Sequence, residues 1–185
     1  PGLKVLVTGA GGFVGRALLR ALGAEHEAVA FDRDLAGAPG IEGDLCDATA
    51  LARALDTGCE AIVHLATVPG GAAESDPALA WRVNVDATRT LFDAAARASR
   101  PIRLVFASSI AVFGDHLPTP LDEDAPVAPA MLYGAHKAMM ETWLATLGRR
   151  GSLHGMALRL SGIVARPAGP SGMKSAFLSE LFHAL

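Results

Sequence analysis

The chain has little charge, few aromatic residues and almost no cysteine. Only 19% of its 185 residues are charged, 5% are aromatic, and Tyr133 is the single tyrosine. The two cysteines, Cys46 and Cys59, form no CxxC pair, which excludes a disulfide scaffold and is typical of a reducing, cytoplasmic setting. We expect both to be buried as small hydrophobic residues. No run of Lys or Arg forms a basic stripe, so no nucleic-acid partner is expected.

Long apolar runs and metal-ligand patterns are also missing. No apolar stretch approaches the roughly 20 residues of a membrane helix, and the apolar residues 3–7 are too few for a signal peptide. The six histidines form neither HExxH nor a spaced Cys/His set, so no metal site is expected. The acidic run at 122–124 is interpreted as solvated. With 51% hydrophobic residues, the chain is expected to form a packed globular fold.

Short apolar runs alternate with helical patterns along the chain. The runs predict strands at 3–7, 27–31, 61–65, 102–106 and 156–160, and the helical spacing predicts helices at 15–22, 49–55, 77–98 and 131–147. Strands that are apolar throughout and separated by helices predict the α/β class, with a doubly wound parallel sheet. Turn-rich loops at 67–77, 114–130 and 166–172 follow strands, which is the ligand side of such a sheet.

A glycine-rich turn joins the first predicted strand to the first predicted helix. Gly9, Gly12 and Gly15 have the spacing Gly-x-x-Gly-x-x-Gly. Glycine permits a tight turn and lets the backbone approach a pyrophosphate, and the following helix directs its N–H groups at that anion. The strand–turn–helix context favours a dinucleotide site. A glycine-rich turn with no ligand is the alternative.

Acidic residues after the second strand bear on the choice of cofactor. Asp32 lies 17 residues after Gly15, where a carboxylate accepts hydrogen bonds from the adenosine ribose and repels a 2′-phosphate, which favours NAD over NADP. Arg33 would partner that phosphate and leaves NADP open. Asp44, followed by Leu45, is a candidate for contact with the adenine amine, and its alternative is an ordinary helix-capping acid.

A second group of polar residues follows the fourth strand. Ser108 and Ser109 come directly after it, and Tyr133 and Lys137 are four apart, so they share one face of a helix. An ammonium beside a phenol favours the phenolate and lowers the phenol pKa from about 10, which suits it to acid–base work.

These motifs resemble the extended short-chain dehydrogenase/reductase family, the NAD-dependent epimerases and dehydratases, over residues 3 to 165. The resemblance implies a Rossmann fold that binds NAD in residues 1–165. It implies that Tyr133 is the general acid or base, that Lys137 holds the nicotinamide ribose and lowers the Tyr133 pKa, and that Ser109 binds the reacting oxygen with Ser108 beside it. Further cofactor contacts implied are the backbone amides of Phe13 and Val14, and the cleft residues Leu65, Ala66 and Asn84.

The resemblance also carries expectations about assembly and about the end of the chain. Family members often pair through two long helices, here 77–98 and 131–147, where Trp81 and Trp143 would pack in a homodimer; burial against their own sheet is the alternative. Residues 166–185 are expected to begin a C-terminal substrate-binding region. Pro rather than Met at position 1 and an unfinished helical pattern at 179–185 suggest a processed or incomplete chain.

A narrower resemblance is to the D-erythronate dehydrogenase branch, through residues 159–167 and 175–179 and the Val-Phe-Gly run at 112–114. It implies oxidation of a four-carbon sugar acid with NAD. Arg166 is then a candidate to clamp the substrate carboxylate, with a solvated loop arginine as the alternative. The chain departs from the branch at Ser161-Gly162, where Pro-Thr is expected, and at Ala176, where Ser is expected.

Three functions follow from these patterns. The first is a dehydrogenase that oxidises a hydroxyl of a sugar or sugar acid, and the second is a nucleotide-sugar epimerase that returns the hydride to its substrate. The third is a non-catalytic dinucleotide-binding protein, which the presence of Tyr133, Lys137 and Ser109 disfavours. Dehydration is disfavoured because residues 109–111 lack the acids that relatives use for elimination.

Overall fold

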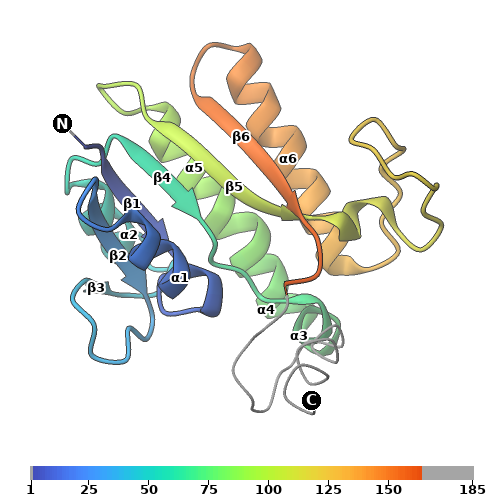
Figure 1. Ribbon diagram of the computed structural model, residues 1–185, viewed down its shortest axis with the longest axis horizontal. Coiled ribbons are helices and arrows are strands. Elements are labelled where there is room, and N and C mark those ends of the chain that lie inside the picture. The colour runs from blue at the N-terminus through green and yellow to red at the C-terminus, as the bar shows by residue number, and fades with distance from the viewer. Residues whose placement is uncertain (1, 164–185) are drawn as a thin grey trace.

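Six parallel strands form the centre of the molecule (Figure 1). The computed structural model describes residues 2–163. The strand order is β3-β2-β1-β4-β5-β6, and the strands are β1 (Lys4–Thr8), β2 (Glu27–Asp32), β3 (Ile41–Glu42), β4 (Ala61–His64), β5 (Arg103–Ser109) and β6 (His154–Leu160). This is the doubly wound parallel sheet that the alternation of strand and helix patterns predicts.

Helices cover both faces of the sheet because the crossovers are right-handed and strands are added in one direction up to β3 and in the opposite direction from β4 on. In Figure 1, α1 lies on one face, and α2, α5 and α6 lie on the other. The helical segments are α1 (Phe13–Leu22), α2 (Ala48–Leu55), α3 (Gly70–Ser75), α4 (Pro77–Trp81), the π-helix η1 (Arg82–Ala87), α5 (Thr88–Ala96), the 3₁₀ turn η2 (Ile110–Phe113) and α6 (Leu132–Arg149).

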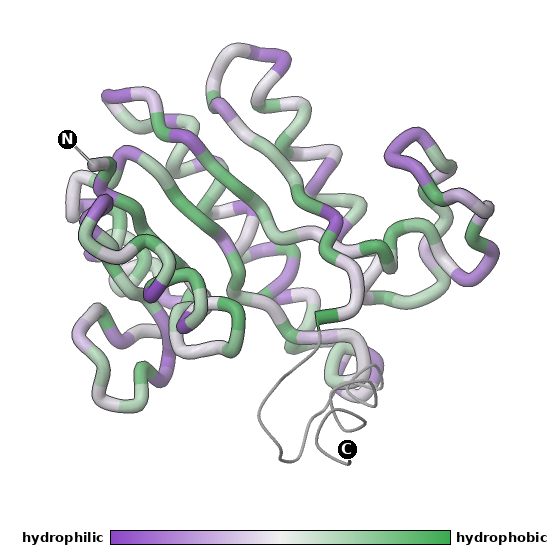
Figure 2. The backbone as a smooth tube through the Cα atoms, in the orientation of Figure 1, coloured by the Kyte–Doolittle hydropathy of each residue, from purple (hydrophilic) through white to green (hydrophobic). Residues whose placement is uncertain are grey.

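The hydrophobic core follows these two faces. The larger cluster packs alternate residues of the strands, such as Ile62, Leu104 and Phe106, against α2, α5 and α6. The smaller one packs Val5 and Val7 against the apolar side of α1. Figure 2 shows the contrast between these strands and the hydrophilic loop that follows β5. Successive side chains of a strand point to opposite faces, so both layers are built from the same strands.

The structure differs from the sequence expectations in the long helix at 77–98. The helical run covers 77–96, and six of its residues form the π-helix η1. The hydroxyl of Thr88 donates to the Val83 carbonyl at 3.1 Å, five residues back. Asn84, within η1, directs its side chain to a neighbouring loop. A π segment of six residues is little more than one turn long, which is too short to give a periodic signal of its own.

Three short elements were not predicted. α3 lies in the segment expected to be a loop, because its first residues, Gly70 and Gly71, are poor helix formers. β3 has two residues and η2 has four, which is too short for a periodic signal.

Other expectations concerned single residues. Cys59 is buried as predicted, but Cys46 is exposed on the turn before α2, so that prediction was wrong. Residues 122–124 are exposed, as expected of a solvated acidic run. Within residues 2–163, no group of His, Cys, Asp and Glu has an arrangement that would hold a metal ion. None of the helices described is both long enough and apolar enough to cross a membrane.

Candidate active site

A cavity of about 720 Å³ opens where the strands end, at the carboxyl edge of the sheet. Nearly all site residues predicted from the sequence line it: Gly9, Gly12, Phe13, Val14, Gly15, Asp32, Asp44, Leu45, Leu65, Ala66, Ser108, Ser109, Tyr133 and Lys137. Loops that follow parallel strands meet at this edge, which is where open α/β sheets bind ligands. Arg166 lies outside the described residues.

The glycine turn has almost no room for side chains. Gly9 has a φ of +72°, and a Cβ there would lie 2.6 Å from the Ala66 nitrogen. A Cβ on Gly15 would lie 2.2 Å from the Gly9 carbonyl oxygen. Gly12 caps α1 without a side-chain hydrogen bond. The turn is therefore a close backbone cradle at a helix N-terminus, which is the geometry that favours a phosphate group.

Asp32 stands at the end of β2, beside this cradle. Its carboxylate accepts the N–H of Gly11 at 2.9 Å and the N–H of Arg33 at 2.7 Å. These amides fix the carboxylate at the rim of the cavity. Asp44 accepts from the Cys46 amide at 2.9 Å, and the residue that caps α2 is Asp47. Asp44 is therefore not the N-cap of α2, so that alternative reading of Asp44 was wrong.

A buried hydrogen-bond chain connects the ends of β1 and β4 to the start of α5. His64, at the end of β4, is fully buried, and its Nδ1 lies 2.6 Å from the Thr8 hydroxyl oxygen. Its Nε2 lies 2.9 Å from the Thr88 hydroxyl oxygen. Thr88 donates its own proton to Val83, so it accepts from Nε2–H, and Nδ1 accepts from Thr8. Burial and the nearby Lys137 charge lower the pKa of His64 to about 3, so the ring is neutral.

Asn84 does not line the cavity. Its side chain is buried and holds the loop after β4, accepting the Val68 N–H at 2.7 Å and donating to the Val68 carbonyl at 2.9 Å. Its carboxamide oxygen also accepts from the Thr67 hydroxyl. Thr67 and Val68 line the cavity. Asn84 therefore shapes the cavity wall through the loop.

Lys137 is buried in the wall of the cavity. Its side chain is only 3% exposed, and its Nζ donates to the Ala107 carbonyl at 2.7 Å. The same nitrogen lies 4.5 Å from the centre of the Phe106 ring and 5.5 Å from that of Tyr133. Burial lowers the pKa of Lys137 to about 7, and the Glu141 carboxylate opposes that shift. Tyr133 itself is half-buried in the cavity wall.

The two serines have different partners. The Ser109 oxygen accepts the Ala111 N–H at 3.2 Å, which leaves its own hydrogen to donate. Ser108 is 2% exposed, and its hydroxyl donates to Glu141. Ser109 is therefore equipped to bind a reacting oxygen, whereas the Ser108 hydroxyl is bound to the helix behind the strand.

Sequence reasoning missed the ion pair behind the serines. Arg159 of β6 donates to Glu141 from Nε at 3.1 Å and from Nη2 at 2.9 Å. It also donates from Nη1 to the Glu123 carbonyl, and its guanidinium lies 4.7 Å from the Phe113 ring. Ser108 and Arg159 are register partners. The four-residue spacing from Lys137 to Glu141 was a usable signal, but the pairing of β5 with β6 was not visible in the sequence.

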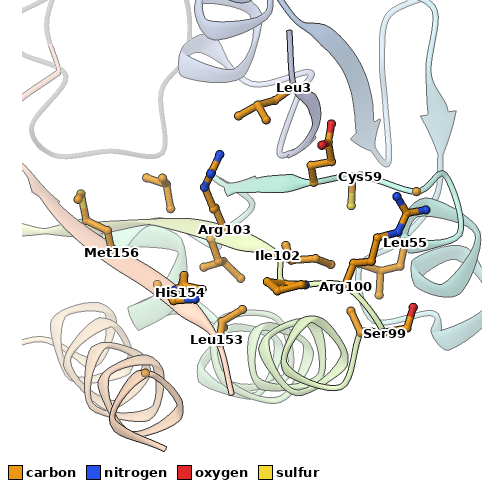
Figure 3. A pocket seen from close by; sticks show the side chains of 18 residues that line it. Leu3, Leu55, Cys59, Ser99, Arg100, Ile102, Arg103, Leu153, His154 and Met156 are labelled. Atoms are coloured by element: carbon orange, nitrogen blue, oxygen red, sulfur yellow. The ribbon is translucent and has the colours of Figure 1, made fainter. Parts of the chain in front are cut away.

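A second hollow, of about 1030 Å³, lies at the opposite edge of the sheet, where the strands begin (Figure 3). Leu3, Cys59, Arg103, His154 and Met156 are among the residues that line it. None of the predicted site residues is among them. Its polar and charged side chains lie on the surface, with Arg103 and His154 both exposed. This hollow therefore lacks the convergent, buried polar groups of a catalytic site.

Comparison with known proteins adds independent findings. The sequence profile of the NAD-dependent epimerase/dehydratase family matches residues 5–184. A D-erythronate dehydrogenase from Cupriavidus necator is 36% identical over 98% of this chain, and the alignment covers 61% of that protein. The chain thus spans about three fifths of the length of this relative.

Two solved structures share the fold. A nucleoside-diphosphate-sugar epimerase from Agrobacterium tumefaciens superposes with a TM-score of 0.83 and 33% identity, covering 96% of this chain and 58% of that one. A short-chain dehydrogenase/reductase superfamily protein from the same organism, solved with bound NAD, gives a TM-score of 0.76 and 36% identity, covering 84% and 48%. These likenesses agree with the resemblance carried by the sequence motifs.

Proposed function

The chain belongs to the NAD-dependent epimerase/dehydratase family, and from that premise we propose that it carries the cofactor site and catalytic groups of an enzyme that oxidises a hydroxyl of a sugar-like substrate with NAD. The observation that carries this proposal is that Ser109, Tyr133 and Lys137 line the same cavity as the glycine cradle. A cofactor in that cradle and a substrate beside Tyr133 would lie in the same cavity, close enough to react.

The residues present fit NAD. A side chain at Gly9 or Gly15 would fill the space between the turn and its neighbours, as the close approaches above indicate. These two glycines, Gly12 and the first amides of α1, at Phe13 and Val14, would hold the pyrophosphate. Asp32 would accept from the adenosine ribose, and Asp44 and Leu45 would flank the adenine. Leu65 and Ala66 would line the cleft, with Asn84 supporting its wall. NADP fits less well because the Asp32 carboxylate would face its 2′-phosphate.

Proton transfer is assigned to this chain's own residues. When bound, NAD supplies the hydride acceptor. Tyr133, as phenolate, would take the hydroxyl proton, and Ser109 would donate a hydrogen bond to the same oxygen. Lys137, as ammonium, would stabilise the phenolate and bind the nicotinamide ribose. Ser108 would act from behind the strand, because its hydroxyl is bound to Glu141.

The proposed substrate is a small sugar acid such as D-erythronate. The relative from Cupriavidus necator, named for that substrate, supports this choice. Arg166 would hold the substrate carboxylate in a bidentate pair. The test uses the complete protein with NAD and D-erythronate, followed at 340 nm, with NADP in parallel. Growth of the NADH signal with NAD, and a weaker signal with NADP, is expected.

The second candidate is a nucleotide-sugar epimerase, which the likeness to the Agrobacterium tumefaciens epimerase favours. It would use the same proton transfer but return the hydride to the substrate. A flat 340 nm trace with D-erythronate, together with interconversion of UDP-sugars, would contradict the dehydrogenase and support the epimerase. A flat trace with no turnover of either substrate class would contradict both.

We also propose that the complete protein is a cytoplasmic homodimer. Trp81, Met139 and Trp143 are 45%, 43% and 39% exposed, so the two tryptophans do not bury against their own sheet as the alternative required. Trp81 ends α4, within the segment 77–98, and Trp143 lies on α6, which covers the segment 131–147; these are the two segments expected to pair. Sedimentation of the complete protein tests the dimer, and replacement of Trp81 by Ser should weaken it. Both described cysteines are free, which suits a reducing compartment.

A further inference from the structure

The charge on Lys137 needs a physical explanation. Transfer of an ammonium into a protein interior is costly, and a buried lysine without compensation becomes neutral. Lys137 is 3% exposed, and the carbonyl of Ala107 occupies only one of its three N–H donors among the hydrogen bonds described. The proposed function requires the charged form. Something else near Nζ must therefore offset the loss of water.

Phe106 is the first such group. This residue of β5 is 1% exposed, and the Lys137 nitrogen lies over its ring at 4.5 Å from the centre. The face of an aromatic ring carries partial negative charge, and its attraction for a cation is strongest where water is excluded. Phe106 precedes Ala107, the residue whose carbonyl accepts from Nζ. Two successive residues of β5 therefore hold the ammonium, one by its side chain and one by its backbone.

Glu141 is the second group. It lies one turn after Lys137 on α6, and its carboxylate opposes the effect of burial on the Lys137 pKa. Ser108 and Arg159 hold this carboxylate in place by direct hydrogen bonds. The bound carboxylate is 13% exposed, so its charge is only weakly screened by solvent.

Three further ionisable side chains lie near Lys137. Tyr133 faces it from α6 at 5.5 Å, measured from Nζ to the ring centre. His64 faces it from β4, stacked on Phe106 with ring centres 5.8 Å apart, and is neutral. Arg159 of β6 reaches this region through its ion pair with Glu141. Among these groups, the Phe106 ring and the Glu141 carboxylate are the ones that favour the ammonium while leaving Tyr133 available for catalysis.

We propose that Phe106 and Glu141 are positioning residues that keep the Lys137 side chain charged and fixed beneath Tyr133. Neither belongs to the Ser–Tyr–Lys set, and neither lines the part of the cavity assigned to substrate. The inference rests on the proposed function for its purpose, because a charged Lys137 matters only if Tyr133 must ionise. The placement of the ammonium can nevertheless be tested without substrate or cofactor.

The test is a direct titration of Lys137 in the complete protein, labelled with [ε-¹³C]lysine and observed by NMR. The 185 residues contain only three lysines, and Lys137→Arg identifies the signal. Phe106→Leu should move the titration midpoint lower by about one pH unit, because it removes the ring face. The matched control is Phe92→Leu. Phe92 is equally buried and packs edge-on against Phe106 at 5.4 Å, but the aromatic rings beneath Nζ are those of Phe106 and Tyr133.

A second series preserves the shape of the core. Phe106 is replaced by mono-, di- and trifluorinated phenylalanine, which progressively withdraws charge from the ring face at nearly constant volume. The midpoint should fall in step with fluorination, and the same series at position 92 should leave it unchanged. This series remains informative where Phe106→Leu does not fold.

The carboxylate is tested by Glu141→Gln against Glu123→Gln, which removes the same charge from the loop next to Arg159. The Lys137 midpoint should fall in the first variant and stay within about 0.2 pH units in the second. Equal midpoints in wild type, the fluorinated Phe106 series and Glu141→Gln would overturn the proposal. If the midpoints move as expected but the complete protein oxidises no hydroxyl, the proposed function fails and the assignment of the ammonium site stands.

Discussion

The two edges of the sheet differ in chemistry more than in size. The hollow at the amino edge is the larger, about 1030 Å³ against about 720 Å³ at the carboxyl edge. Its polar residues, such as Arg103 and His154, remain in solvent. The smaller cavity brings together the buried Lys137 amine and the half-buried Tyr133 phenol of α6 with the backbone cradle that follows β1. Convergent, desolvated polar groups therefore distinguish the candidate site, and volume does not.

Two glycines allow this comparison to be tested at equal backbone strain. Gly9, at the carboxyl edge, has φ +72°, and Gly58, which lines the amino-edge hollow, has φ +75°. A Cβ at Gly9 would meet backbone at 2.6 Å, whereas nothing lies within 4 Å of one at Gly58. Gly58→Ala should cost about 1 kcal/mol of unfolding free energy, and Gly9→Ala about 3 kcal/mol or more, with loss of NAD binding. Urea unfolding measures the free energy of unfolding of each variant, and NADH fluorescence measures its cofactor binding. Equal losses of stability in the two variants would show that the close packing around Gly9 has no effect.

Burial of Lys137 lowers the free energy of unfolding of the protein, and the size of this effect depends on pH. Its pKa in the folded protein is about 7, below the ordinary 10.5, so the unfolded chain binds more protons between these values. The cost of burying the group is complete below pH 7 and is relieved as pH rises toward 10.5. Lys137→Met should therefore be more stable than wild type by about 3 kcal/mol at pH 7, with the gap closing by about pH 10. Denaturant unfolding at several pH values measures the gap; a gap independent of pH would contradict the assignment.

Asp32 tests the choice of cofactor at the same edge. Asp32→Ala removes the carboxylate proposed to bind the ribose, so NAD affinity should fall about tenfold to a hundredfold. NADP affinity should fall less or rise, because the repulsion of its 2′-phosphate is removed as well. The control is Asp34→Ala, which removes an exposed carboxylate bonded to the nearby Ala36 amide. Fluorescence titrations with NADH and NADPH give the four affinities. An equal loss for both cofactors would show that Asp32 only supports the loop.

The amino edge should show the smallest effects. Arg103→Ala and His154→Ala change exposed side chains of the larger hollow. Each should alter unfolding free energy by no more than about 0.5 kcal/mol and leave turnover within about twofold. A larger loss of turnover in either variant would mean that the amino edge takes part in function, and the contrast between the two edges would fail.

Much of the fold was predictable because its signals are local. Apolar strands, the glycine turn after β1 and the Tyr133–Lys137 spacing depend on neighbours within a few residues, and the structure places them as expected. The π-helix was missed because its six residues form little more than one turn, which is too short for a periodic signal. α3 was missed because tertiary contacts stabilise it in spite of Gly70 and Gly71.

The support of the site was harder to predict because it depends on contacts between distant residues. The Thr8–His64–Thr88 chain joins three elements, and no local pattern in the sequence shows that these three side chains meet. The same holds for Ser108 and Arg159, whose partnership requires the register of β5 and β6. Sequence motifs identified groups that face the cavity. The residues that hold those groups became visible only with the packing.

The role of Tyr133 as the proton acceptor is tested most directly by the turnover of Tyr133→Phe in the complete protein. The change removes one hydroxyl and keeps the ring that packs beside Lys137. We expect kcat to fall by at least about a hundredfold, with NADH affinity and unfolding free energy close to those of wild type. Turnover by Tyr133→Phe at the wild-type rate would contradict that role, because the proton would then leave the substrate by another route.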